Sequence, residues 1–131
     1  MKFNGMLNHV EINVSNLFDS RKFWALFPIK LGYDLHQEWS EGFSYIKEGT
    51  YIVFVQTHER YLKLKYHRSG TGLNHLAFSV ESREEVDGLR NLIKSCGLNE
   101  LYSERYPHAG GDDNYVLFFE DPHRIKVEVA C

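Results

Sequence analysis

The sequence predicts an α+β protein built from two β-α-β-β-β modules, and three observations carry this prediction. The pattern Leu-Asn-His-apolar-x-apolar-x-Val occurs at residues 7–14 and again at 73–80, with one histidine at the same place in each copy. Each copy is followed by a stretch with helical spacing, and each helical stretch by three short stretches typical of strands. A repeat that occurs once, at half the chain length, indicates a duplicated half-domain and not a solenoid.

The first module begins at residues 7–14, where apolar side chains alternate as they do in a half-buried strand. Asp19 or Ser20 can cap a helix that runs to about Phe27, and Pro28 is expected to stop it. Three strands of a meander are expected next, separated by residues typical of turns, at 33–39, 43–47 and 51–57.

The second module repeats this order from residue 72. Ser82 and Glu85 have the spacing of a capping box, in which the serine accepts from a free helix amide and the glutamate bonds back. Apolar residues at helical spacing follow as far as Cys96, and Gly97 suits a left-handed cap. Three further strands are expected at 98–105, 115–120 and 125–129.

Length and composition are those of one compact domain over residues 1–131, with modules at about 6–58 and 72–130. Hydrophobic residues make up 43% and charged residues 25%, which is ordinary for a soluble globular protein. A net charge of −3 gives no support for binding nucleic acid, and no apolar run is long enough to span a membrane. Cys96 and Cys131 do not have the spacing of metal ligands. We expect a cytoplasmic protein with no nucleic-acid or membrane partner.

Alternation along the two repeated strands predicts where the histidines point. His9 shares a strand face with Glu11 and Asn13, and His75 shares one with small residues. The opposite face of both strands is apolar and should pack on the helices. The histidines should therefore point away from the helical layer.

Glu128 supplies a third candidate ligand. It lies between two valines in a strand that otherwise has the composition of a buried one, and buried carboxylates are rare unless they are paired or bind a metal. Two histidines and one carboxylate with open positions suit non-haem iron, and equally zinc, nickel or manganese. A single strand histidine is usually structural and a single strand glutamate usually solvated, so it is the repeat that favours a metal site at His9, His75 and Glu128.

These segments resemble the vicinal oxygen chelate superfamily, also called the glyoxalase/bleomycin-resistance/dioxygenase fold. The resemblance covers about residues 6–130. It rests on NHVEINVSNLFDSRKFW, on LNHLAFSVESREEVD, and on VLFFEDPHRIKVEVA, which is similar to the family ending aspartate-proline-x-glycine-x-x-x-glutamate. It implies that the modules pair into an open cup-shaped mixed sheet with helices outside, that His9, His75 and Glu128 occupy the metal-ligand positions, and that the protein is a homodimer.

The chain departs from the lactoylglutathione lyases of that family in its first module. Those enzymes have a ligating glutamate on the last strand there, whereas an overlay of YIVFVQ on IKVEVA places Phe54 opposite Glu128. Gln56, two residues on and on the same face, is a candidate fourth ligand or substrate contact through its amide oxygen. Otherwise three protein ligands remain, as in fosfomycin thiol-transferases and extradiol dioxygenases.

Two further departures disfavour classical methylglyoxal detoxification. Asn13 stands where the lyases commonly carry an arginine for a glutathione carboxylate, so it becomes a candidate substrate-binding residue instead. The turn at 121–124 also lacks the usual glycine, which restricts its backbone angles.

Three other residues are candidates for contact with a substrate. Glu11, two residues after His9, is placed to abstract a proton α to a carbonyl, although a solvated glutamate at the rim is the alternative. His108 and Tyr115 lie in or beside a glycine-containing loop that can serve as a lid, and an ordinary hairpin loop explains them equally well.

The function expected from these residues and the resemblance is that of a metal-dependent enzyme. A divalent metal would chelate a small-molecule substrate through two neighbouring oxygens and act as a Lewis acid, which suits an isomerase or lyase. Dioxygenase and thiol-transfer chemistry remain alternatives. A non-catalytic binder of the bleomycin-resistance kind is another, although such proteins typically lack the two histidines and the glutamate.

Overall fold

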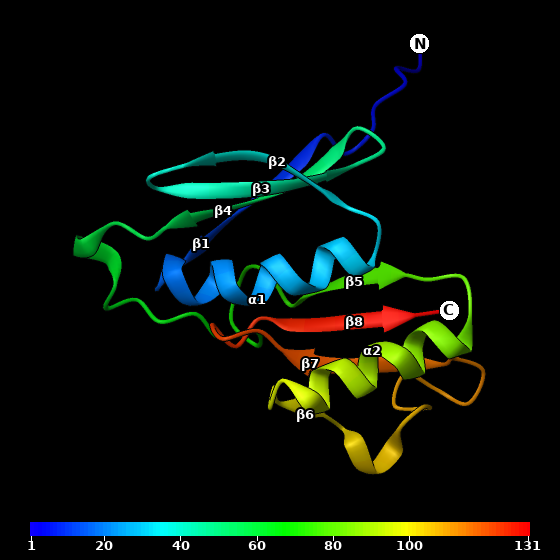
Figure 1. The fold of residues 1–131 in the computed structure, drawn as a ribbon. Helices are drawn as coiled ribbons and strands as arrows, with labels where there is room; N and C mark the ends of the chain where they lie inside the picture. The colour runs from blue at the N-terminus through cyan, green and yellow to red at the C-terminus, as the bar shows by residue number, and fades with distance from the viewer. The chain divides into compact units, whose positions relative to one another are not determined.

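The computed structural model describes residues 1–131 and consists of two compact units, residues 1–64 and 65–131. Each unit contains one open four-stranded mixed sheet and one α-helix, as Figure 1 shows. The predicted α+β class is therefore confirmed. Each unit is described separately.

The first unit has a β-α-β-β-β order followed by a short 3-10 turn. Its elements are β1 (His9–Val14), α1 (Leu17–Lys30), β2 (Asp34–Trp39), β3 (Gly42–Lys47), β4 (Thr50–Gln56) and η1 (Glu59–Tyr61). The strand order is β1-β4-β3-β2, and only the β1–β4 pair is parallel. The first and last strands of the unit are therefore hydrogen-bonded neighbours, with β1 at the edge of the sheet.

The helix α1 begins earlier and ends later than the sequence predicts. Asn16 is its N-cap, because its side-chain oxygen accepts from the Asp19 amide at 3.2 Å, so the prediction of a cap at Asp19 or Ser20 is wrong. Pro28 lies inside the helix, which continues to Lys30. Proline is tolerated there because it lies in the last turn, where the missing amide removes a single hydrogen bond.

Aromatic packing fixes which face of the first sheet α1 covers. Trp24 of α1 is fully buried and its ring lies 4.5 Å from that of Phe54, which in turn stacks on Phe43. Phe54 therefore points towards α1. Because side chains alternate along a strand and register partners share a face, His9 and Glu11 of the neighbouring strand point to the opposite face.

The second unit repeats the order with a shorter second strand. Its elements are β5 (His75–Ser79), α2 (Arg83–Ser95), β6 (Glu100–Leu101), η2 (Ser103–Arg105), β7 (Val116–Glu120) and β8 (Lys126–Ala130). The strand order is β5-β8-β7-β6, with β5 parallel to β8 and the other pairs antiparallel. In Figure 1, α2 lies across β7.

Two local predictions for α2 are confirmed and one for β6 is wrong. The Ser82 hydroxyl accepts from the Glu85 amide at 3.2 Å while the Glu85 carboxylate accepts from the Ser82 amide at 3.0 Å, and Gly97 has a φ of +66°. The strand expected at 98–105 is only Glu100–Leu101. It ends because Tyr102 adopts a left-handed conformation (φ 56°), which turns the chain into η2.

The helical face of the second sheet follows from one bidentate ion pair. Arg90 of α2 donates to both carboxylate oxygens of Glu100, at 2.7 and 3.0 Å, and Glu100 is the register partner of Phe119. The helix therefore covers the face that carries Phe119 and the fully buried Val127 and Val129.

None of the helices has the length and apolar composition needed to cross a bilayer.

Candidate functional site

The second unit brings two of the predicted ligands together. His75 Nε2 lies 3.0 Å from Glu128 Oε2. His75 and Glu128 are two of the predicted metal ligands, and they meet because β5 and β8 pair in parallel, with Ala77 beside Glu128. Both side chains are partly exposed, at 32% and 21%, so an ion can reach them. They lie on the face of the sheet opposite α2.

The third predicted ligand, His9, lies in the first unit. Its side chain is exposed at the start of β1, and its ring stacks on Tyr51 with centroids 4.6 Å apart and planes 9° apart. Tyr51 is its register partner on β4. The prediction that both histidines point away from the helical layer is confirmed within each unit.

Both histidines make the same hydrogen bond to the residue before them. His9 Nδ1 lies 2.6 Å from the side-chain oxygen of Asn8, and His75 Nδ1 lies 2.7 Å from that of Asn74. Since an amide oxygen only accepts, Nδ1 is the donor in both bonds, and a neutral imidazole that donates from Nδ1 has its lone pair on Nε2. Sequence reasoning did not single out these asparagines, although each belongs to the repeated Leu-Asn-His.

The donor chemistry of the second unit fits a metal cation. His75 Nε2 and Glu128 Oε2, an imidazole nitrogen and a carboxylate oxygen, lie 3.0 Å apart. Both are atom types that divalent transition metals bind. Within either unit, no three His, Cys, Asp or Glu side chains are grouped as metal ligands.

Strand register corrects the overlay of the two modules. Tyr51 pairs with His9 and Lys126 with His75, so the residue equivalent to Glu128 is Val53 and not Phe54. The overlay was one residue out of register, and such a slip moves a side chain to the other face of the sheet. The first unit therefore offers no oxygen ligand at the position equivalent to Glu128.

Gln56 does not lie on the strand face that the overlay implied for a metal ligand. It lies on the face of β4 that carries Phe54, towards α1. Its amide oxygen accepts from the Leu17 amide at 2.9 Å, and its amide nitrogen donates to the Ser15 and Thr57 carbonyls at 2.9 and 3.3 Å. Gln56 thus joins the end of β4 to the first turn of α1.

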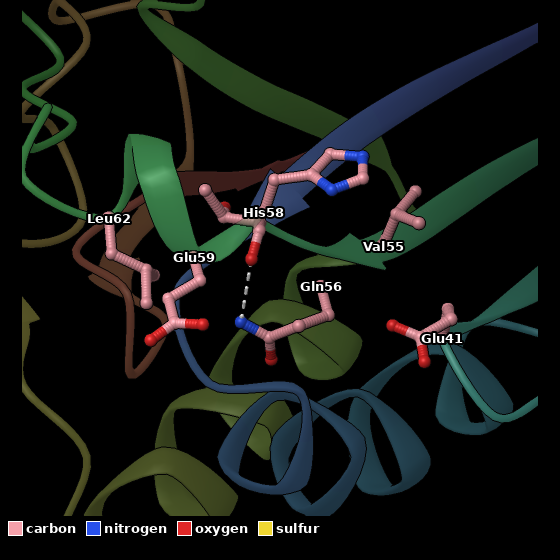
Figure 2. Close-up of a pocket in the computed structure, with 7 residues that line it drawn as sticks. Glu41, Val55, Gln56, His58, Glu59 and Leu62 are labelled. Atoms are coloured by element: carbon pink, nitrogen blue, oxygen red, sulfur yellow. Dashed lines mark hydrogen bonds between the residues drawn. The ribbon is translucent and has the colours of Figure 1, made fainter.

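A pocket of about 360 Å³ lies beside Gln56 in the first unit, lined by residues 55–59 together with Glu41 and Leu62. Figure 2 shows the Gln56 amide between the Glu41 and Glu59 carboxylates, with its nitrogen bonded to a backbone carbonyl. Among the predicted site residues only Gln56 lines this pocket, so it is not the location of the predicted metal site.

Glu11 and Asn13 lie on the same face of β1 as His9. Both are exposed, and their register partners on β4 are Val53 and Val55. This face combines an imidazole, a carboxylate and an amide with an apolar neighbouring strand. A carboxylate and an amide therefore lie on the strand face that carries His9.

His108 and Tyr115 are not brought to the face that carries His75 and Glu128. The Tyr115 hydroxyl donates to Asp87 of α2 at 2.7 Å, and Tyr106 donates to the same carboxylate oxygen. These two bonds lower the pKa of Asp87, whereas burial and the same hydrogen bond raise the pKa of Tyr106. His108 Nδ1 donates to the Asn114 carbonyl at 2.9 Å, so His108 holds the 102–115 loop internally, whereas Tyr115 ties it to α2.

The chain is similar to a known protein family and to a bacterial relative over nearly its whole length. The family model of the Glyoxalase/Bleomycin resistance protein/Dioxygenase superfamily matches residues 6–129. The uncharacterized protein YqjT of Bacillus subtilis (strain 168) is 47% identical over 125 residues, which are 95% of this chain and 98% of that protein.

Solved structures give the same picture. A provisionally named glyoxalase from Bacillus halodurans has 52% sequence identity and a TM-score of 0.95, over 98% of this chain and 96% of that chain. Lactoylglutathione lyase from Agrobacterium tumefaciens has a TM-score of 0.67 over 99% and 95% of the two chains. At 13% identity the latter likeness is one of fold alone.

Proposed function

Because the chain belongs to the Glyoxalase/Bleomycin resistance protein/Dioxygenase superfamily, we propose that it is a metal-dependent enzyme acting on a small oxygenated metabolite. The observation that carries the proposal is the approach of His75 Nε2 and Glu128 Oε2 to 3.0 Å on the face of the sheet that α2 leaves uncovered. Isomerase or lyase chemistry is the reaction type that we propose.

The proposed ligands are His9, His75 and Glu128, and the cation is zinc, nickel, iron or manganese. Two neutral imidazoles and one carboxylate leave a divalent cation with a net positive charge. Such a cation would supply Lewis-acid chemistry to two neighbouring oxygens of the substrate. Because Val53 stands at the position equivalent to Glu128, the first unit would add no carboxylate to the set.

Glu11 and Asn13 are proposed to act on the substrate beside the metal. Glu11 is an exposed carboxylate on the face of His9 and would take a proton from the carbon next to a carbonyl. Asn13 would orient the substrate through hydrogen bonds from the same face. The neighbouring Val53 and Val55 would exclude water from one side of this position.

We also propose that the protein is a cytoplasmic homodimer. All six residues of β2 are exposed, and β2 is an edge strand of its sheet. An uncovered edge strand can pair with a second copy of the chain. Light scattering after size exclusion should give about twice the chain mass, and a monomer mass would contradict this.

Metal analysis of protein purified without chelator tests the proposed function. We expect about one equivalent of a transition metal, lost in His75→Ala. His67→Ala is the matched control, because His67 is also an exposed histidine of the second unit and is not a proposed ligand. Metal binding that is equal in both variants, or protein that takes up none of the four metals, contradicts the proposal.

The outcome also separates the reaction classes. A metal-free protein that binds apolar small molecules would be a non-catalytic binder. Oxygen consumption by an iron-loaded protein would indicate a dioxygenase, and activity with zinc or nickel in the absence of oxygen an isomerase or lyase.

A further inference from the structure

We infer that Asn8 and Asn74 are positioning residues, which hold the proton of each site histidine on Nδ1 and so present Nε2 as the donor atom. The inference rests on the proposed metal site for its purpose. The hydrogen bonds themselves are observed in each unit independently.

The same asparagine–histidine hydrogen bond occurs in both units, although the surrounding residues differ. In the first unit Asn8 directly precedes β1 and its side-chain oxygen lies 2.6 Å from His9 Nδ1. In the second unit Asn74 directly precedes β5 and the corresponding distance from its oxygen to His75 Nδ1 is 2.7 Å. All four side chains reach the solvent at least in part, so burial does not force either contact.

An amide oxygen can only accept a hydrogen bond, and this determines the tautomer. A neutral imidazole has one N–H and one lone pair, and the partner of one nitrogen decides which nitrogen holds the proton. With Nδ1–H donated to asparagine, Nε2 must hold the lone pair. Partners of this kind orient metal-bound histidines in proteins generally, and their loss costs roughly 10–100-fold in metal affinity.

The plane of each ring is held by a second contact that differs between the units. The His9 ring stacks on that of Tyr51, with 9° between the ring planes. The centroid of the Tyr51 ring also lies 5.0 Å from that of His36. At His75, Nε2 lies 3.0 Å from the Glu128 carboxylate instead. The Asn8 oxygen therefore favours Nδ1–H at His9 without metal, whereas at His75 acceptors face both nitrogens and the Asn74 oxygen holds the proton on Nδ1 once a cation binds at Nε2.

The tautomer is measured directly by ¹⁵N-edited NMR of the histidine rings, in the metal-free protein and after adding Zn²⁺. At about pH 8.5, where an ordinary imidazole is neutral, we expect His9 to carry its proton on Nδ1 without metal. With Zn²⁺ bound, both His9 and His75 should show this tautomer. Asn8→Leu should lose the Nδ1–H preference at His9 in the metal-free protein.

Zn²⁺ affinity provides the second readout. Asn8→Leu and Asn74→Leu should each raise the Kd by about 10–100-fold, whereas Asn8→Asp and Asn74→Asp, which keep an acceptor, should stay close to the wild type. Asn91→Leu is the matched control, since Asn91 is an exposed asparagine of α2. Leucine variants that bind Zn²⁺ as the wild type does would overturn the inference.

The two hypotheses fail in different ways. A wild-type protein that binds no metal but holds His9 as the Nδ1–H tautomer contradicts the proposed function and supports the role of Asn8. A wild-type protein that binds Zn²⁺ but shows His9 with its proton on Nε2 in the metal-free state overturns the inference and leaves the metal site standing.

Discussion

His75 Nε2 and Glu128 Oε2 lie 3.0 Å apart although 53 residues separate them in the chain. Parallel pairing of β5 with β8 brings them together, on the face of the sheet that α2 does not cover. We expect Glu128→Gln to remove the charge of a proposed ligand and to raise the Kd for Zn²⁺ at least about 100-fold, as measured by competition with a chromogenic chelator. Glu104→Gln, at an exposed glutamate of the same unit, should leave the Kd unchanged; equal loss in both variants would contradict the assignment.

Gln56→Leu separates a structural role from a ligand role. The variant leaves the Leu17 amide without its acceptor and removes the bonds to the Ser15 and Thr57 carbonyls, so the free energy of unfolding should fall by about 1–3 kcal/mol. Zn²⁺ affinity should not change. Urea unfolding and the same chelator assay measure the two quantities, with Asn91→Leu, at an exposed amide of α2, as control. Weaker Zn²⁺ binding with unchanged stability would restore Gln56 as a ligand.

The hydrogen bonds of Glu120 predict that the free energy of unfolding falls at acidic pH. Burial raises its pKa, but hydrogen bonds from Arg68 at 2.6 Å and Asn99 at 3.1 Å outweigh this and hold the pKa below its ordinary value. A carboxyl group whose pKa is lower in the folded protein than in the unfolded chain stabilises the fold. This stabilisation is complete above the unfolded pKa of about 4.3 and is lost as the pH falls through the pKa of the folded state.

Glu120→Gln should therefore be less stable at neutral pH and lose less stability on acidification than the wild type does. Circular dichroism against urea at several pH values measures both effects. Glu104→Gln is the exposed control and should follow the wild-type curve. If the Glu120→Gln variant proved as acid-sensitive as the wild type, another carboxyl would be responsible.

Arg124 occupies the glycine position of the family's closing motif and has a φ of +68°. A left-handed conformation costs a side-chain-bearing residue about 1–2 kcal/mol, whereas the ion pair with Glu120 at 3.8 Å is exposed on the arginine side and contributes less. Arg124→Gly should thus raise the free energy of unfolding by up to about 1 kcal/mol, after the entropy that glycine gains in the unfolded chain.

Arg124→Ala is the informative comparison, because it removes the ion pair and keeps the backbone strain. In urea unfolding, we expect Arg124→Gly to have the highest free energy of unfolding, the wild type an intermediate value and Arg124→Ala the lowest. Alanine as stable as glycine at this position would mean that the turn does not strain the backbone.

Much of the fold could be predicted from residues close together in the chain. Alternation placed His9 and His75 on the face away from the helices, and the spacing of Ser82 and Glu85 predicted a capping box that the structure contains. These features depend on periods of two and of about 3.6 residues, which the backbone imposes locally. Where a local conformation was unusual, as at Tyr102, the prediction of a long strand failed.

The sequence by itself determined the two β-α-β-β-β modules, the face of each histidine and the choice of candidate ligands, because side-chain alternation and capping act over a few neighbouring residues. Only the tertiary structure decided that Val53 and not Phe54 is equivalent to Glu128, and that Gln56 bonds to the start of α1. Register between β1 and β4 depends on packing between segments far apart in the chain, and a shift of one residue exchanges the two faces of a strand. That exchange cannot be detected from the order of residues in either strand alone.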